Sequence, residues 1–177
     1  MPFGYEESPV MLIKGIPVGL IGINDLTGGA ETQLIAELEK VKRKGARLII
    51  CYFHWGTELE PMPTRTSAIL PILPSTRRSF GSGCHPHIVQ GTETYKGRRI
   101  IYSLGNFCFG GNSNPRDKDA LIYQERFAFE DGYLHGSDGG TLIACRISST
   151  PYYNDYRPVL YEGAEKERVL QKIADRS

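Results

Sequence analysis

The feature that most constrains this chain is a strand–helix–strand order in its first third. Residues 18–23 form a short apolar run, and residues 31–44 carry four apolar side chains at helical spacing. Residues 46–53 then form a largely apolar strand, a pattern typical of a strand covered on both faces. Strands alternating with a helix in this way indicate an α/β layered fold.

Length and composition limit what this fold can be. A chain of 177 residues that is 40% apolar can bury one sizeable core but is short for two domains. Its formal charge of +1 gives no reason to expect a nucleic-acid partner. The longest apolar stretches have strand length, so no transmembrane segment is expected, and residues 1–8 show no signal peptide.

Four cysteines lack the spacing of a disulfide scaffold. We expect those in strand-like runs (Cys51, Cys108 and Cys145) to be buried free thiols.

The remaining elements are mostly short strands separated by turn residues. A closing helix carries its apolar residues on one face, and Asp117, Lys118 and Asp119 are expected to form a solvated turn. The expected strands are residues 10–14, 88–89, 99–104, 121–129, 133–134 and 141–147, with a hairpin across Glu130-Asp131-Gly132, and the closing helix is residues 164–174.

Three of the four histidines lie where metal ligands are often found. His54 follows the buried strand, and sites in open α/β sheets gather at the carboxyl ends of strands. His85-Pro86-His87 places two imidazoles on a stiff spacer, and imidazole is a common ligand of zinc, manganese and iron. The alternative for His54 is a structural histidine packed against Trp55.

Two further readings stay open from the residues alone. Cys51 and His54, with Cys84 and His85, would suit a structural zinc site, but Cys51 and His54 are three residues apart on a strand and point to opposite faces. Asn106 either places an amide at the site or caps its loop. We expect His135 to be a bystander.

Three ordered motifs carry a family resemblance. Phe53–Glu58 reads FHWGTE, His85–Gly91 reads HPHIVQG, and Tyr95–Gly111 reads YKGRRIIYSLGNFCFGG. Together with the run at residues 13–23, this string resembles the poly-gamma-glutamate capsule-biosynthesis (CapA) family of the calcineurin-like metallophosphatase superfamily.

The resemblance implies a sandwich of two β-sheets flanked by helices, in α/β/β/α layers, with two divalent metals of the Mn, Fe, Zn or Mg class at strand ends. It implies that His54 and His85 serve one metal and His87 the other. Glu58 and Asn106 become candidate substrate-binding residues. Such ions lower the pKa of a bridging water and clamp a phosphoryl-like centre. The expected substrate is an anionic polymer or a phosphoester, in the bacterial cytoplasm or cell envelope.

One departure from the family concerns the upstream motifs. The superfamily's D-x-H, G-D-x-x and G-N-H strings are absent, so residues 1–177 are expected to be the C-terminal half of one incomplete domain. Three histidines without carboxylates would form an incomplete site, which leaves enzyme activity open. The alternatives are a non-catalytic truncated remnant and a partner-binding module whose partner supplies the missing half.

A second departure lies at residues 67–82, where the family has a helix and the strand before the histidine motif. Pro71 and Pro74 would break that helix. We expect the loss of both elements to open a sheet edge and leave the chain marginally stable. One hypothesis is that this stretch is translated out of frame, and the alternative is a divergent loop.

Overall fold

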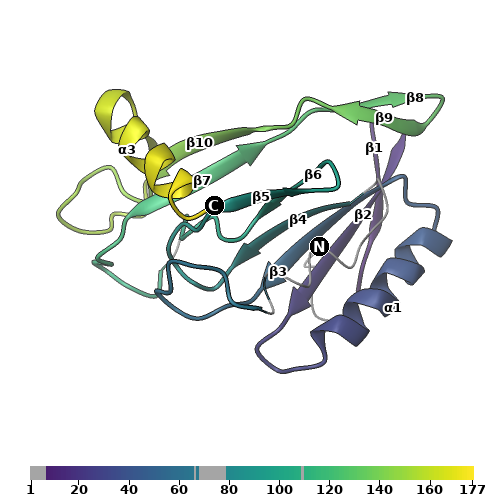
Figure 1. The fold of residues 1–177 in the computed structure, drawn as a ribbon, viewed down its shortest axis with the longest axis horizontal. Helices are drawn as coiled ribbons and strands as arrows, with labels where there is room; N and C mark the ends of the chain where they lie inside the picture. The colour runs from purple at the N-terminus through teal and green to yellow at the C-terminus, as the bar shows by residue number, and fades with distance from the viewer. Residues whose placement is uncertain (1–6, 66, 68–78, 109) are drawn as a thin grey trace.

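The computed structural model describes residues 7–65, 67, 79–108 and 110–177, and it confirms the α/β class. The described strands form a six-stranded sheet, a three-stranded sheet and a two-stranded hairpin (Figure 1). The large sheet has the order β1-β2-β3-β4-β6-β5, with β1 at Val10–Ile13, β2 at Ile16–Asn24, β3 at Leu48–His54, β4 at Ser79–Cys84, β5 at Thr92–Tyr95 and β6 at Arg98–Ile101. Its four central strands are parallel, so their carboxyl ends meet at one edge.

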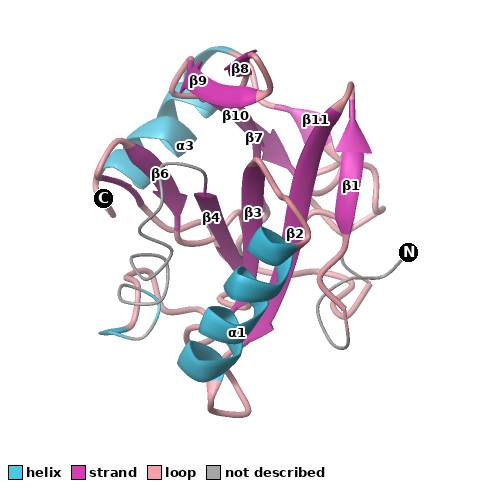
Figure 2. Ribbon diagram, turned by 90° about the vertical axis from the view of Figure 1, so that its right-hand side faces the viewer, coloured by secondary structure: helices cyan, strands magenta, loops and turns pink. Residues whose placement is uncertain are grey.

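Helix α1 (Ala30–Arg43) covers one face of this sheet (Figure 2). Three of the four predicted apolar residues, Leu34, Leu38 and Val41, are buried against β2 and β3, and each such side chain contributes about 1.5–3 kcal/mol. The fourth, Ile35, is 45% exposed. Gly19 permits the close approach, because a Cβ there would lie 3.0 Å from the Cβ of Val41.

The opposite face of β3 is less covered than the sequence predicted. Ile49, Cys51 and Phe53 are buried, but the alternate residue Tyr52 is 38% exposed. The expectation of a strand covered on both faces was therefore wrong within the described residues. A continuous apolar run does not distinguish a strand covered on both faces from one covered on a single face. Ile50 and Tyr52 are apolar or aromatic side chains that also occur on a half-exposed surface.

Strand β4 corrects the expectation for residues 67–82. Its residues pair in parallel with β3 on one side and with β6 on the other, so the strand before the histidine motif is present and opens no edge. Small residues there form a strand because their backbone groups complete the ladder between two neighbours. The expected loss of the helix falls on residues 68–78, which lie outside the described residues.

The small sheet has the order β11-β10-β7, from Val159–Leu160, Thr141–Arg146 and Asp119–Gln124. Helix α3 (Gly163–Ala174) packs against it, where Val169 and Ile173 join Leu121 and Ala144 in one buried cluster. The C-terminal turn contacts the segment before β5, since Arg176 donates from Nη1 to the carbonyl of Val89 at 2.5 Å. It also reaches the large sheet, where the N–H of Thr92 on β5 donates to Ser177 Oγ at 2.9 Å.

The predicted hairpin across residues 130–132 is confirmed. Strands β8 (Phe127–Glu130) and β9 (Tyr133–Ser137) meet at Asp131 and Gly132, which have φ of 50° and 74°. The run 121–129 is two strands rather than one, because β7 ends at Gln124.

Three smaller expectations need correction. Residues 88–89 form no named strand, and Val89 makes only an isolated bridge to Leu104. Cys108 is exposed, whereas Cys51 and Cys145 are buried as expected, and all four cysteines are free. Asp119 is 4% exposed and ion-paired to α3, so residues 117–119 are not simply a solvated turn. The local sequence could not reveal the ion pairing of Asp119, because its partners Arg168 and Lys172 lie about fifty residues downstream.

No helix within the described ranges combines the length and apolar character needed to cross a membrane.

Candidate metal centre

The candidate metal centre lies where two parallel strands end side by side. His54 is the last residue of β3 and Cys84 the last of β4, and the two are direct partners in the ladder. His85 follows at once, so its imidazole and that of His54 come together with ring centroids 4.6 Å apart. The sheet register therefore assembles histidines that are thirty-one positions apart in sequence.

Glu58, His85 and His87 form a compact set of metal-ligating groups within the part of the chain that the structure describes. One carboxylate oxygen and one nitrogen from each imidazole all lie within 4.8 Å of one another. Both histidines are half-buried and Glu58 is exposed, so the set opens to solvent on one side. The sequence named Glu58 only as a substrate-binding candidate and expected no carboxylate at the histidines. The structure brings one there.

The backbone around His85-Pro86-His87 is strained. His85 has a φ of 96° and His87 a φ of 58°, both in the left-handed region that non-glycine residues rarely adopt. Such conformations cost roughly 1–3 kcal/mol each and persist only where the surroundings hold them. Here the strain turns two imidazoles two residues apart toward one side.

Asn106 determines which ring nitrogen of His87 carries the hydrogen. Its amide oxygen lies 2.7 Å from His87 Nδ1. Because an amide oxygen only accepts, Nδ1 carries the hydrogen and Nε2 is the unprotonated nitrogen, the form in which imidazole binds metals. Asn106 is buried, at 7% exposure, which holds this contact away from water. The amide thus belongs to the site rather than only to its loop.

The loop that carries Glu58 is fixed by two contacts. Leu59 donates its backbone N–H to the carbonyl of Pro86 at 2.9 Å, which ties the glutamate's neighbour to the histidine motif. The Gln90 side chain donates to the carbonyls of Glu60 at 2.8 Å and Met62 at 3.0 Å. Gln90 is 1% exposed, so a buried amide braces an otherwise exposed loop. Sequence reasoning missed Gln90, although its position within the HPHIVQG motif was a signal.

His54 stands beside this set rather than within it. Its Nδ1 lies 3.3 Å from Cys84 Sγ. Burial, and then the neighbouring His85 and His87, lower the pKa of His54, which favours the neutral imidazole that binds metals.

The rival zinc site is not assembled. Cys51 lies in the buried core, where burial raises its pKa to about 12, away from His54 on the other face of β3. His135 lies on β9, where its side chain is 72% exposed beside Glu130.

Comparison with known proteins identifies the family. The family model of the bacterial capsule synthesis protein PGA_cap matches residues 13–111, more than half of the chain. This chain belongs to that family. The match includes all five candidate site residues, from His54 to Asn106.

Two curated proteins are moderately similar to this chain. The capsule biosynthesis protein CapA of Bacillus anthracis is 27% identical over 179 residues, covering 91% of this chain and 41% of the relative. The PGA biosynthesis protein CapA of Bacillus subtilis (strain 168) is 25% identical over 126 residues, covering 63% and 33%. The chain therefore spans less than half the length of either relative. Among solved structures, a 5'-nucleotidase precursor from Thermus thermophilus matches with a TM-score of 0.43 and 14% identity, over 95% of this chain and 33% of that one.

Proposed function

We propose that this PGA_cap family chain binds a divalent metal ion through Glu58, His85 and His87. The observation that carries the proposal is the approach of their three ligand atoms to within 4.8 Å of one another. Two imidazoles and a carboxylate are a ligand set found in catalytic zinc sites, and three protein ligands leave a position open for water or substrate. Imidazole pairs favour Zn, Mn or Fe over Mg, which prefers oxygen ligands.

A metal ion held there would supply Lewis-acid activation of water or of a substrate oxygen. The chain's own residues prepare the site. Asn106 accepts from Nδ1 of His87 and so assigns Nε2 as the proposed metal-binding nitrogen, and Gln90 holds the loop that carries Glu58. His54, neutral and adjacent to His85, is the proposed ligand of a second position.

We further propose that the substrate is anionic. Two relatives are named for capsule and PGA biosynthesis, which supports an anionic polymer, and the superfamily resemblance supports a phosphoester. In either case the metal would neutralise charge that develops on an oxygen, so hydrolysis is the reaction class that we propose.

Metal binding tests the first step directly. The purified 177-residue chain, stripped with chelator, is titrated calorimetrically with Zn²⁺ and with Mn²⁺. We expect one site, and we expect Glu58→Gln, His85→Ala and His87→Ala each to weaken it at least about tenfold. His135→Ala is the matched control, since its imidazole is exposed and lies on β9. Equal affinity in the wild type and in His85→Ala would overturn the proposal. Hydrolysis of a chromogenic phosphomonoester and of poly-gamma-glutamate by the loaded protein then distinguishes the two substrate classes.

A second candidate function is partner binding at the edge of the large sheet. Met11, Leu12 and Ile13 of β1 are 50%, 74% and 47% exposed, and β1 pairs only with β2 among the described strands. An apolar edge of this kind favours the addition of a strand from another polypeptide. Mass measurement in solution, with Leu12→Lys as the variant, tests this candidate separately from metal binding.

A further inference from the structure

A second polar site lies between α3 and the small sheet. A cavity of about 470 Å³ opens there, and its lining includes eight charged side chains. Five are cationic and three are acidic, an excess of two positive charges. None of them belongs to the candidate metal centre. We call this cavity the α3 cleft.

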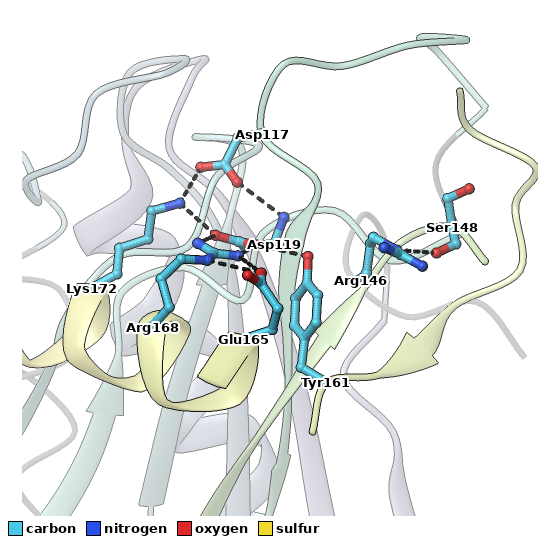
Figure 3. A network of polar contacts seen from close by, with 8 residues as sticks. All are labelled: Asp117, Asp119, Arg146, Ser148, Tyr161, Glu165, Arg168 and Lys172. Carbon is cyan, nitrogen blue, oxygen red and sulfur yellow. Dashed lines mark hydrogen bonds and ion pairs between the residues drawn. The ribbon is translucent and has the colours of Figure 1, made fainter. Parts of the chain in front are cut away.

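All three acidic side chains of the α3 cleft already have a cationic partner. Asp119 accepts from Arg168 at 2.8 and 2.9 Å and from Lys172 at 2.6 Å (Figure 3). Asp117 accepts from Lys172 at 2.8 Å, and Glu165 accepts from Arg168 at 3.0 Å. Two cations are thus shared among three carboxylates. Arg168 and Lys172 join α3 to Asp119 at the start of β7, and Lys172 also contacts Asp117 just before that strand.

The other three cations have no carboxylate partner among the described residues. Arg146 donates only to backbone carbonyls, to Ser148 at 2.7 Å and Ser149 at 2.7 Å. Lys118 donates to the neutral Asn114 amide at 2.7 Å and to a carbonyl at 3.0 Å. Arg116 is exposed and makes no hydrogen bond or ion pair within the part of the chain that the structure describes.

Arg146 is also held in place for a ligand. Its guanidinium is anchored by two carbonyls and lies 5.9 Å from the centroid of the Tyr161 ring. Figure 3 shows it on the other side of Tyr161 from the Asp119 cluster, and it forms no ion pair with Asp119, although the two residues are partners in the β7–β10 ladder. A guanidinium fixed in this way loses little entropy when it binds an oxyanion.

We infer that the α3 cleft binds an anionic group, a carboxylate or a phosphate, through Arg116, Lys118 and Arg146. Each offers charge-assisted hydrogen bonds, which are roughly twice as strong as neutral ones. The volume of the cleft admits an anion larger than a single phosphate or carboxylate. The inference does not rest on the proposed metal site, because the two share no residue.

Binding is measured on the metal-free 177-residue chain by NMR chemical-shift titration, with inorganic pyrophosphate in one arm and triglutamate in the other. We expect saturable shifts at residues that line the cleft, and weaker binding as salt is raised from 20 to 200 mM, because the contacts are ionic. Saturation by either probe supports the inference and identifies phosphate or carboxylate as the group bound. Saturation by neither probe at low salt overturns it.

Variants locate the site. Arg116→Ala removes a side chain without partners and should weaken binding at least about fivefold with the fold intact, as should Lys118→Ala. Arg43→Ala, whose guanidinium on α1 is 72% exposed, is the matched control and should leave binding unchanged. A double variant His85→Ala/His87→Ala should also bind normally, which separates this site from the metal centre. Unchanged affinity in Arg116→Ala and Lys118→Ala would refute the assignment.

Discussion

At the scale of single residues, the neighbours of the ligands decide what the ligands can do. His87 would offer a metal the wrong nitrogen if its hydrogen lay on Nε2. The Asn106 oxygen at 2.7 Å from Nδ1 prevents this. A buried amide with one such contact acts as a positioning group, and groups of this kind typically change metal affinity by about 10–100-fold when removed.

We therefore predict that Asn106→Ala weakens metal binding at least about tenfold while leaving the site occupied at high metal concentration. Asn106→Asp keeps an oxygen acceptor and should restore most of the affinity. Calorimetric titration with Zn²⁺ measures both. If Asn106 were purely structural, Asn106→Asp would weaken metal binding more than Asn106→Ala, because a buried carboxylate destabilises the fold more than alanine does.

Gly83 sets a steric limit on the strand that leads into the histidine motif. A Cβ there would lie 2.1 Å from Trp55 Nε1 and 2.5 Å from the carbonyl of Tyr102, the two atoms that share a 2.8 Å hydrogen bond. Trp55 is fully buried and stacks on Phe53, so it cannot move aside.

We predict that Gly83→Ala lowers the free energy of unfolding by about 3 kcal/mol or more, because the added methyl group overlaps backbone and a buried ring. Chemical denaturation measures the change. Gly136→Ala on β9 is the control, since a Cβ there meets nothing within 4 Å. Comparable stability in both variants would contradict the steric argument.

The site residues could be predicted from sequence only where a local pattern existed. His85-Pro86-His87 is such a pattern, and His54 was identifiable from its place after an apolar strand. The role of Glu58 was not, because it depends on a loop folded back by Gln90 thirty residues later. Asp119 was misread for the same reason, since its partners lie on α3.

At the scale of elements, helix α3 is held by polar contacts from its middle to just beyond its C-terminal end. Arg168 and Lys172 bind the buried Asp119, while Arg176 binds the Val89 carbonyl close to the histidine motif. Burial acts to raise the pKa of Asp119, but hydrogen bonds from Arg168 and Lys172 outweigh it and hold that pKa well below its usual value. The carboxylate therefore stabilises the fold in its charged form.

We predict that Asp119→Asn lowers the free energy of unfolding by about 1–3 kcal/mol at pH 7, less than for a fully buried pair because Arg168 is partly exposed to solvent screening. The folded pKa lies below the unfolded value of about 3.9, so this stabilisation is complete above that pH. It is lost as pH falls from there toward the folded pKa, and the two proteins should converge at low pH. Urea denaturation across pH 2.5–7 measures this. Asp131→Asn, in the exposed β8–β9 turn, should show no such convergence.

At the scale of the whole molecule, the net charge does not show where charged side chains are concentrated. The formal charge of +1 gave no reason to expect a nucleic-acid partner and did not reveal local charge, yet the lining of the α3 cleft carries an excess of two positive charges. The strand–helix–strand start and the closing helix were predictable because their periodicity is local. Strand β4 was not, since Ser79–Cys84 has little strand propensity and depends on pairing with β3 and β6.

The edges of the large sheet follow from the same pairing. With β4 inside the sheet, the edge strands among the described residues are β1 and β5. Strand β1 carries four consecutive apolar residues, of which three are exposed and Leu12 is the most exposed. Natural edge strands are usually protected by charges, prolines or bulges, and residues 10–13 contain none of these.

We predict that the purified chain associates reversibly, with a mass that rises with concentration, because β1 can pair with a β-strand of another molecule. Leu12→Lys should shift the midpoint of association at least about tenfold higher in concentration, since a charge on the edge opposes pairing. Tyr152→Lys is the control, because that side chain is 81% exposed but lies in a loop. Light scattering coupled to size-exclusion chromatography gives both masses. A monomer at every concentration, or equal shifts in the two variants, would rule out the β1 edge as the interaction surface.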